Sequence, residues 1–259
     1  MRSYPALAGL RIGCVKYLNS KPLIHGYEGD VLFDHPSGLA RDLAAGQLDV
    51  ALVPTFEALR SPYYTMAEGV GIACDGPVYS VFLAHRGALA DLRRVALDPA
   101  SLTSVHLLQV LLREYHGVRP ELCDLSAFPA EADAALIIGN QAIDFRQHDE
   151  EGYRILDLGE EWKRCTGLPF VFAPWLLRPD LLQPTEVAAD LRALKAHGLA
   201  CLEDIVRAEP RDPDFTRRYL TQHIRFELGD REKAGIAKFR ELLAKHGFIA
   251  DAKTALRYA

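Results

Sequence analysis

Short apolar runs alternate with segments of helical periodicity over the first half of the chain. Residues 11–15, 31–33 and 47–54 are predicted strands, and the last is a continuous apolar run typical of a buried parallel strand. Residues 38–45 form a predicted helix, with Ser37 as its expected N-cap and a glycine at its end. Repeated strand–turn–helix units of this kind predict an α/β domain.

Two longer apolar runs, residues 76–84 and 170–175, are predicted strands that cross between two lobes. The segment between them has its own α/β pattern. It begins with a predicted strand at residues 95–97 and a helix at 104–114, and a buried strand follows at 134–140. We therefore expect a second lobe inserted into the first.

The chain after residue 179 is predicted to be helical, since its apolar positions recur every three or four residues. The charged stretch at residues 146–151 is typical of a solvated loop. The expected fold class is thus α/β with two lobes and a helical C-terminal part. The first lobe is discontinuous, residues 1–86 plus 177–259, and the second is residues 87–176.

Composition excludes several classes of partner and location for the protein. The chain has 259 residues, 49% of them hydrophobic and 25% charged, with a net charge of −5, as in an ordinary globular protein. A negative charge without a dense basic run argues against nucleic acid as a partner. No apolar segment approaches the roughly 20 residues that span a bilayer. The N-terminus lacks the apolar core of a secretory signal, so we expect a cytoplasmic protein that does not enter membranes.

Cysteine and histidine patterns give no sign of a metal site. The five cysteines are scattered without a C-x-x-C pair, and the nine histidines lack H-E-x-x-H spacing. The Gly69-Val70-Gly71 sequence does not continue into a dinucleotide fingerprint, and no phosphate-binding loop is present. We expect no disulfide, no metal and no cofactor.

Two polar turns are the first candidates for a binding site. Ser101, Thr103 and Ser104 fall at the start of a predicted helix, where unpaired backbone N–H groups and the helix dipole favour an anion. A simpler alternative is that Ser101 or Thr103 caps its own helix. The second polar turn, residues 16–21, contains Asn19, which could equally be an ordinary turn residue.

Ligands of open α/β sheets bind beyond the carboxyl ends of the strands. If the two lobes face each other, further polar or glycine residues join these turns in one cleft. They are Ser37, Ser80, Gly139, Asn140, Thr166 and Gly167.

Obvious catalytic groups are scarce in this set. Glu57 and Asp98 are more typical of a helix residue and a turn former, and His106 of an ordinary helix residue. The amide of Asn19 is not an effective base at neutral pH, although it can orient a hydroxyl or a carboxylate. The residues alone therefore predict a two-lobed binder of a small anion.

An ordered set of short motifs extends over roughly residues 10–176. It comprises residues 17–19, 22–23, 36–37, 39–40, 46–54, 76–78, 80–81, 97–98, 101, 103–104, 166–173 and 175. Together these motifs resemble the chorismate dehydratase family of the futalosine route to menaquinone. One position departs from the family pattern, because Asn140 stands where the family is expected to have Asp.

The resemblance implies a type II periplasmic-binding-protein-like fold used as a cytosolic enzyme. It implies conversion of chorismate to 3-[(1-carboxyvinyl)oxy]benzoate and water. On this basis Asn19 is expected to orient the substrate and Ser80 to donate a hydrogen bond. The hydroxyls at the helix start would hold the carboxylates. The resemblance leaves open whether the protein forms a homodimer.

Three alternatives remain at this point. A non-enzymatic solute-binding protein would share the fold but would need export. The sister enzyme of the same pathway, which makes dihydroxynaphthoate, is expected to differ at the Tyr17-Leu18-Asn19 motif. The effector domain of a transcription regulator would need a DNA-binding motif for which this chain has no room.

Overall fold

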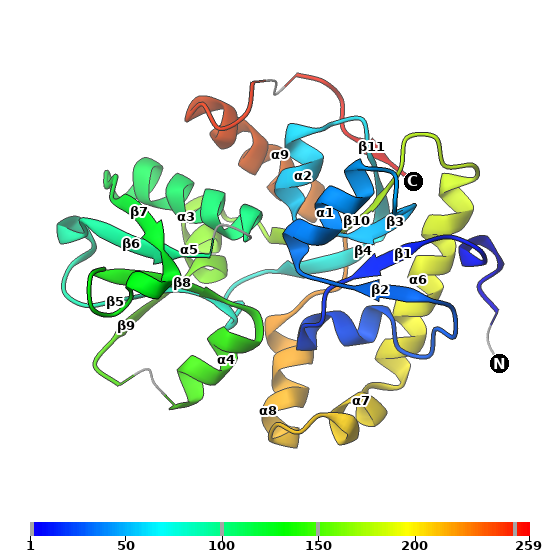
Figure 1. Ribbon diagram of the computed structural model, residues 1–259, viewed down its shortest axis with the longest axis horizontal. Helices are drawn as coiled ribbons and strands as arrows, with labels where there is room; N and C mark the ends of the chain where they lie inside the picture. Colours follow the sequence, from blue (N-terminus) through cyan, green and yellow to red (C-terminus); the bar gives the residue numbers. More distant parts are fainter. Residues whose placement is uncertain (1–2, 99–100, 149–150, 251–252) are drawn as a thin grey trace.

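The computed structural model describes residues 3–98, 101–148, 151–250 and 253–259. Two α/β lobes lie side by side, each built on one mixed sheet (Figure 1). The expectation of a two-lobed α/β fold with a helical C-terminal part is confirmed.

The first sheet has the strand order β11-β4-β10-β3-β1-β2. Strand β1 pairs in parallel with β2 and β3, whereas β10 runs antiparallel to β3 and β4. Its strands are β1 (Ile12–Cys14), β2 (Val31–Phe33), β3 (Val50–Leu52), β4 (Thr65–Cys74), β10 (Phe170–Leu177) and β11 (Arg257–Tyr258).

The second sheet has the order β7-β6-β8-β5-β9. Strands β7, β6 and β8 are mutually parallel, and β5 runs antiparallel to β8 and β9. Its strands are β5 (Val81–His85), β6 (Arg94–Leu97), β7 (Glu121–Asp124), β8 (Ala134–Ile138) and β9 (Arg154–Asp157).

Helices cover both sheets, and α6 to α9 form the C-terminal part (Figure 1). They are α1 (Pro36–Ala44), α2 (Thr55–Arg60), α3 (Leu102–Tyr115), α4 (Gly139–His148), α5 (Leu158–Thr166), α6 (Pro184–Ala200), α7 (Leu202–Ala208), α8 (Pro213–Arg218) and α9 (Asp230–Lys245). The shorter segments are η1 (Pro5–Leu7), η2 (Leu18–Leu23), η3 (Leu89–Asp91), η4 (Leu125–Ala127) and the π-helical η5 (Tyr219–His223). None of the described helices is long and apolar enough to cross a bilayer.

The chain passes between the sheets twice, and the first crossing differs from the predicted long strand. Strand β4 ends at Cys74 and β5 begins only at Val81, so the prediction of a strand over residues 76–84 is wrong for its first half. Gly76 and Pro77 interrupt the strand pairing, and Tyr79 has a positive φ of 67°. The second crossing is α5 followed by β10.

Sheet membership also differs from the expected lobe boundaries. Strand β5, placed in the first lobe by the sequence analysis, pairs in the second sheet, and β10 pairs in the first. The difference has a simple cause. An apolar run does not reveal its hydrogen-bond partners, so the sheet to which such a run belongs depends on contacts distant in sequence.

Two local expectations are wrong. The charged stretch expected as a loop over residues 146–151 is helical up to His148, the last residue of α4, while residues 149–150 lie outside the described part. Helix α1 begins at Pro36 with His35 as its N-cap residue, so Ser37 is not a cap. Proline suits the first helical turn because its φ is already near the helical value.

An aromatic cluster joins α5 to β10 and α9. Trp162 of α5 lies 5.2 Å from Phe170 of β10 and 6.0 Å from Phe239 of α9, measured between ring centroids. All three side chains are at most 1% exposed. Truncating one such buried aromatic typically costs about 3–5 kcal/mol, so this cluster fixes the second crossing against the C-terminal helices.

Candidate active site

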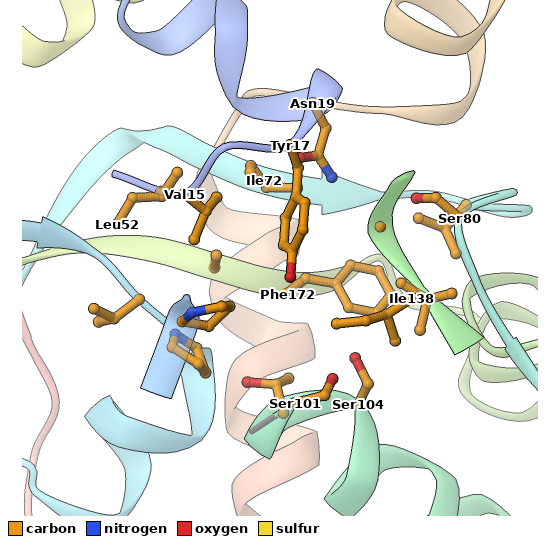
Figure 2. A pocket seen from close by; sticks show the side chains of 18 residues that line it. Val15, Tyr17, Asn19, Leu52, Ile72, Ser80, Ser101, Ser104, Ile138 and Phe172 are labelled. Carbon is orange, nitrogen blue, oxygen red and sulfur yellow. The ribbon is translucent and has the colours of Figure 1, made fainter. Parts of the chain in front are cut away.

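A cavity lies where the two lobes meet, and it contains about 590 Å³ of space free of protein atoms, its open mouth included (Figure 2). Its lining residues come from both lobes. They are Val15, Tyr17, Asn19, Pro36, Leu52, Val53, Pro54, Ile72, Val78, Ser80, Val81, Ser101, Thr103, Ser104, Ile138, Gly139, Phe172 and Ala173.

The cavity is located at the carboxyl ends of parallel strands. Strands β1 and β3 lead into it from the first lobe, and β8 leads into it from the second. Helices α1, α3 and α4 begin at its edge. The lining residues from their first turns are Pro36, Ser101, Thr103, Ser104 and Gly139. The N-terminus of each helix carries a partial positive charge and unpaired N–H groups. The cavity therefore favours an anionic ligand, although its described lining contains no lysine or arginine.

The start of α3 supplies three hydroxyls, as expected. Ser101 and Ser104 are buried, and their Oγ atoms have no hydrogen-bond partner in the part of the chain that the structure describes. Thr103 Oγ1 accepts a hydrogen bond from the Phe56 backbone N–H at 3.1 Å. None of these hydroxyls caps α3, so the capping alternative is not supported. Thr103 Oγ1 instead accepts a backbone N–H from the first turn of α2.

Asn19 belongs to η2 and is 8% exposed. Its Oδ1 atom is buried without a hydrogen-bond partner among the described residues, and the amide end faces the cavity (Figure 2). A buried polar atom without a partner costs on the order of 1–3 kcal/mol. A ligand that donates a hydrogen bond to Asn19 Oδ1 therefore gains binding free energy. The preceding residue, Leu18, donates its backbone N–H to Asn140 Oδ1 at 3.1 Å, which ties this turn to the second lobe.

Ser80 is fully buried and lies across the cavity from Ser101 and Ser104 (Figure 2). Its backbone N–H donates to the Val78 carbonyl at 2.8 Å, which makes Tyr79 the central residue of a tight three-residue turn with φ 67°. Its own carbonyl accepts from Gly139 N–H at 2.8 Å, and its Oγ atom lies 2.7 Å from the Tyr219 hydroxyl. A strained turn held by this many bonds is characteristic of functional sites.

Asp157 fixes the turn before Ser80 from the second crossing. Its carboxylate accepts the backbone N–H groups of Val78 at 3.0 Å and Tyr79 at 2.7 Å. The same carboxylate caps α5 by accepting from Gly159 and Glu160. One buried side chain therefore couples both crossings to the position of Ser80.

Tyr17 extends into the middle of the cavity, with its hydroxyl toward the α3 hydroxyls (Figure 2). Burial, and secondarily the charge of Asp98, raises the pKa of Tyr17, so the hydroxyl is a neutral donor at physiological pH. Gly139 packs against this ring. A Cβ atom at Gly139 would lie 2.9 Å from Tyr17 Cε1, and its φ of +63° also favours glycine.

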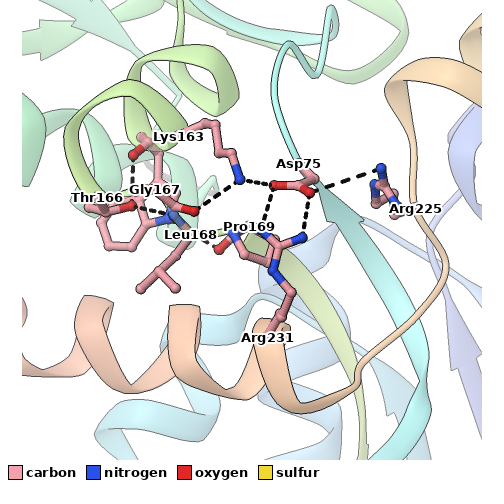
Figure 3. A network of polar contacts seen from close by, with 9 residues as sticks. Asp75, Lys163, Thr166, Gly167, Leu168, Pro169, Arg225 and Arg231 are labelled. Carbon is pink, nitrogen blue, oxygen red and sulfur yellow. Dashed lines mark hydrogen bonds and ion pairs between the residues drawn. The ribbon is translucent and has the colours of Figure 1, made fainter.

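Four of the expected binding residues do not line the cavity. Ser37 is half-buried in the first turn of α1, next to the lining residue Pro36, and Asn140 lies in a neighbouring cavity. Thr166 ends α5, where its Oγ1 atom bonds to the Trp162 carbonyl, and the Gly167 carbonyl accepts from Lys163 at 2.9 Å (Figure 3). Their observed contacts are structural.

Charged groups are missing from the described lining of the cavity. Glu57 pairs with Arg60 on α2, and His106 stacks on Phe56 with ring centroids 3.6 Å apart, as expected for residues with structural roles. Burial raises the pKa of the Glu57 carboxyl and lowers that of His106. No carboxylate or imidazole is therefore positioned as a general base in this wall.

One group of possible metal ligands occurs elsewhere in the described residues. Ligand atoms of His25, Cys201 and Asp204 lie within 4.8 Å of one another. Asp204 is exposed and already forms an ion pair with Arg207. None of these residues contributes to the cavity, so they have no part in its chemistry.

Sequence reasoning did not identify Tyr219 or Asp157 as site residues. Tyr219 lies in a helical segment whose apolar spacing is that of core residues, so its local pattern carried no functional signal. Asp157 precedes a helix with two acidic residues in its first turn, which is a recognisable N-cap pattern. That pattern predicts its capping role but not its contact with residues 78–79.

Comparison with known proteins places the chain in a family. A family model described as menaquinone biosynthesis matches residues 10–245. A protein of Thermus thermophilus named chorismate dehydratase is 33% identical over 90% of this chain and 94% of its own length. A Campylobacter jejuni protein of the same name is 26% identical, over 86% of this chain and 88% of its own. A Streptomyces coelicolor 1,4-dihydroxy-6-naphtoate synthase is 26% identical over 75% and 68%.

Solved structures agree on the fold. A protein from Archaeoglobus fulgidus superposes with a TM-score of 0.74 at 15% identity, over 93% of this chain and 98% of that one. The periplasmic aliphatic sulphonate binding protein of Escherichia coli superposes with a TM-score of 0.64 at 16% identity, over 94% and 89%. The expected periplasmic-binding-protein-like fold is thus confirmed. By its matched residues and its relatives, this chain belongs to the menaquinone biosynthesis family.

Proposed function

We propose that this protein is a chorismate dehydratase, which eliminates water from chorismate to give 3-[(1-carboxyvinyl)oxy]benzoate. The observation that carries the proposal is the character of the cavity. Its described wall combines hydroxyls, one amide and helix N-termini, without a carboxylate or imidazole. Such a wall suits a dianionic substrate whose reaction needs little acid–base help from the protein. The names of the relatives from Thermus thermophilus and Campylobacter jejuni support the same activity.

Chorismate supplies its own driving force. It carries two carboxylates, a ring hydroxyl and a ring hydrogen beside the enolpyruvyl ether. The electron pair of the broken C–H bond enters the ring, the C–O bond breaks, and the hydroxyl leaves with its electron pair as the ring becomes aromatic. The protein has to hold the substrate, exclude water and stabilise the departing hydroxide.

The residues divide into two roles in this proposal. Ser101, Thr103 and Ser104, together with the α3 N-terminus, bind carboxylate oxygens. Each such charge-assisted hydrogen bond contributes on the order of 1.5–3 kcal/mol. Asn19 orients the reacting part of the substrate, and Ser80 donates a hydrogen bond to the leaving hydroxyl. The backbone at Gly139 completes the wall from the second lobe.

We further propose that the enolpyruvyl carboxylate of the substrate accepts the ring proton, because the described lining offers no base. That proton then combines with the departing hydroxide, so that one water forms and no net charge changes. An analogue without this carboxylate should bind and fail to react. Turnover of that analogue at the normal rate would contradict the proposal.

The direct experiment is incubation of the purified protein with chorismate. Formation of the aromatic product is followed by ultraviolet absorption and confirmed by mass spectrometry. Product formation at an enzymatic rate is the expected result. Binding without reaction would instead support a solute-binding protein, and turnover only of a cyclic futalosine derivative would support the dihydroxynaphthoate-forming alternative.

The Asn19→Ala variant tests the assignment within the cavity. We expect turnover to fall by at least about 100-fold, since an orienting group that acts on the reacting atoms is lost. The loss of stability should be small, because Asn19 Oδ1 has no partner among the described residues and the Tyr219 hydroxyl keeps its contact with Ser80. The exposed amide of Gln222 provides the control Gln222→Ala, which should behave as wild type. A fully active Asn19→Ala protein would refute the assignment.

Location and assembly are further parts of the proposal. The five cysteines are free, which suits a reducing cytoplasm. A homodimer is one arrangement open to the chain. Cell fractionation and light scattering of the purified protein test the two points separately.

A further inference from the structure

A buried tyrosine behind the cavity wall contacts the hydroxyl of Ser80. Tyr219 is the first residue of the π-helical segment η5, which continues α8. It is 1% exposed, and its hydroxyl lies 2.7 Å from Ser80 Oγ. Its ring stacks on Phe215 with centroids 5.9 Å apart. π-Helical turns are rare and often occur at functional sites.

The Tyr219 hydroxyl has a second polar neighbour. The Asn19 side chain lies near enough to act on it as a hydrogen-bonding group, so the two residues proposed to act on the substrate both face one buried phenol. Burial raises the pKa of Tyr219 most strongly, while Ser80 and Asn19 oppose that shift. The phenol is therefore neutral at physiological pH, with one proton to donate.

The backbone of Ser80 is already fixed. Its N–H is bonded to Val78 and its carbonyl accepts from Gly139. The remaining freedom is rotation of the hydroxyl proton, which can point either to Tyr219 or into the cavity. If the Asn19 amide donates to the Tyr219 oxygen, the phenol proton is directed to Ser80 Oγ. The Ser80 proton is then left for the cavity.

We propose that Tyr219 is a positioning residue for the dehydration: it accepts a hydrogen bond from Asn19 Nδ2 and donates one to Ser80 Oγ, so that the Ser80 proton points at the leaving hydroxyl. This inference rests on the proposed function. Tyr219 does not line the cavity and acts through the two residues that do.

The expected size of the effect follows from the chemistry. Removing a donor that stabilises developing negative charge on oxygen typically costs 100- to 1,000-fold in rate. Removing Tyr219's hydroxyl leaves the Ser80 donor in place but free to rotate. The loss should therefore be smaller, on the order of 10- to 100-fold in kcat.

The first test is Tyr219→Phe, which removes one oxygen and keeps the ring packed on Phe215. We expect kcat to fall on the order of 10- to 100-fold with KM within about threefold of wild type, since the carboxylate-binding residues are untouched. Thermal unfolding is measured first, and kinetics are run below the transition. Tyr27→Phe is the matched control, because it also loses one hydroxyl contact, to the Leu7 carbonyl at 3.2 Å.

The second test separates positioning from a merely structural effect. If Tyr219 acts through Ser80, its loss should have little further effect once the Ser80 hydroxyl is gone. The double variant Ser80→Ala/Tyr219→Phe should then match Ser80→Ala in kcat within about twofold. Effects that simply multiply would overturn the inference.

These tests distinguish a failure of this inference from a failure of the proposed function. An active wild type with Tyr219→Phe unchanged in kcat overturns this inference and leaves the proposed function intact. A folded wild type that binds chorismate without dehydrating it overturns the proposed function, and this inference falls with it.

Discussion

Individual residues around the cavity are held by neighbours that do not themselves face the ligand. Ser80 is held by Tyr219 and Gly139, and Asn19 lies beside a turn bonded to Asn140. The Asn140 contact bears on the one departure from the family pattern. An amide oxygen that accepts from Leu18 N–H serves here as well as a carboxylate oxygen would, so Asn140 can support the site without carrying charge.

Gly139→Ala tests how closely the lobes must approach. A methyl group there would meet the Tyr17 ring at 2.9 Å, and the positive φ adds strain. We expect a stability loss on the order of 1–3 kcal/mol and a clear fall in chorismate turnover. Gly117→Ala shares the positive φ but meets no atom within 4 Å, so it should lose stability alone. Urea denaturation and initial rates measure both; equal activity of the two variants would contradict the proposed role of the Gly139–Tyr17 contact.

Among the elements, the strand ends, helices and polar turns were predictable because they depend on local pattern. The hydroxyls of α3 and the turn with Asn19 were found in this way. The turn at Tyr79 was not, since a tyrosine with positive φ has no local signature and is imposed by Asp157 and the bonds of Ser80. The sheet membership of β5 and β10 was likewise set by partners distant in sequence.

The contact between α2 and α3 can be tested at Thr103. Its Oγ1 atom accepts from Phe56 N–H in the buried interior, so Thr103→Val leaves that N–H unpaired with almost no change in volume. We expect a loss on the order of 1–3 kcal/mol in the free energy of unfolding. Thr103→Ser retains the oxygen and should recover most of it. If the two variants unfold at the same urea concentration, the hydrogen bond is not what stabilises the junction.

At the scale of the whole molecule, the two crossings are tied together by charge. Asp75 follows β4 and is only 11% exposed in its side chain. It pairs with Lys163 of α5 at 2.6 Å and with Arg231 of α9 at 2.8 Å, and Arg225 lies 4.0 Å away (Figure 3). Together with Asp157, this network links the first crossing, the second crossing and the C-terminal helices. Any motion of one lobe against the other must therefore either keep these ion pairs or break them.

The network also gives a pH dependence of stability. Burial raises the pKa of the Asp75 carboxyl, but hydrogen bonds and charges from Lys163 and Arg231 outweigh it, so the folded pKa lies below the ordinary value. Because folding favours the ionised form, its contribution is complete above the unfolded pKa of about 4 and is lost as pH falls through the folded pKa. Asp75→Asn should therefore cost on the order of 1–2 kcal/mol at pH 7, modest because the network is close to solvent.

Urea denaturation of wild type and Asp75→Asn across acidic pH measures this contribution. The difference in unfolding free energy should be constant between about pH 5 and 7. It should shrink below about pH 4, as the carboxyl is protonated first in the unfolded and then in the folded wild type. Asp91→Asn, which removes the same charge from an exposed position, should show no such trend. A difference that persists undiminished in acid would mean that Asp75 stabilises the crossings by packing or neutral hydrogen bonds. The ion pairs would then contribute nothing to fixing the position of one lobe relative to the other.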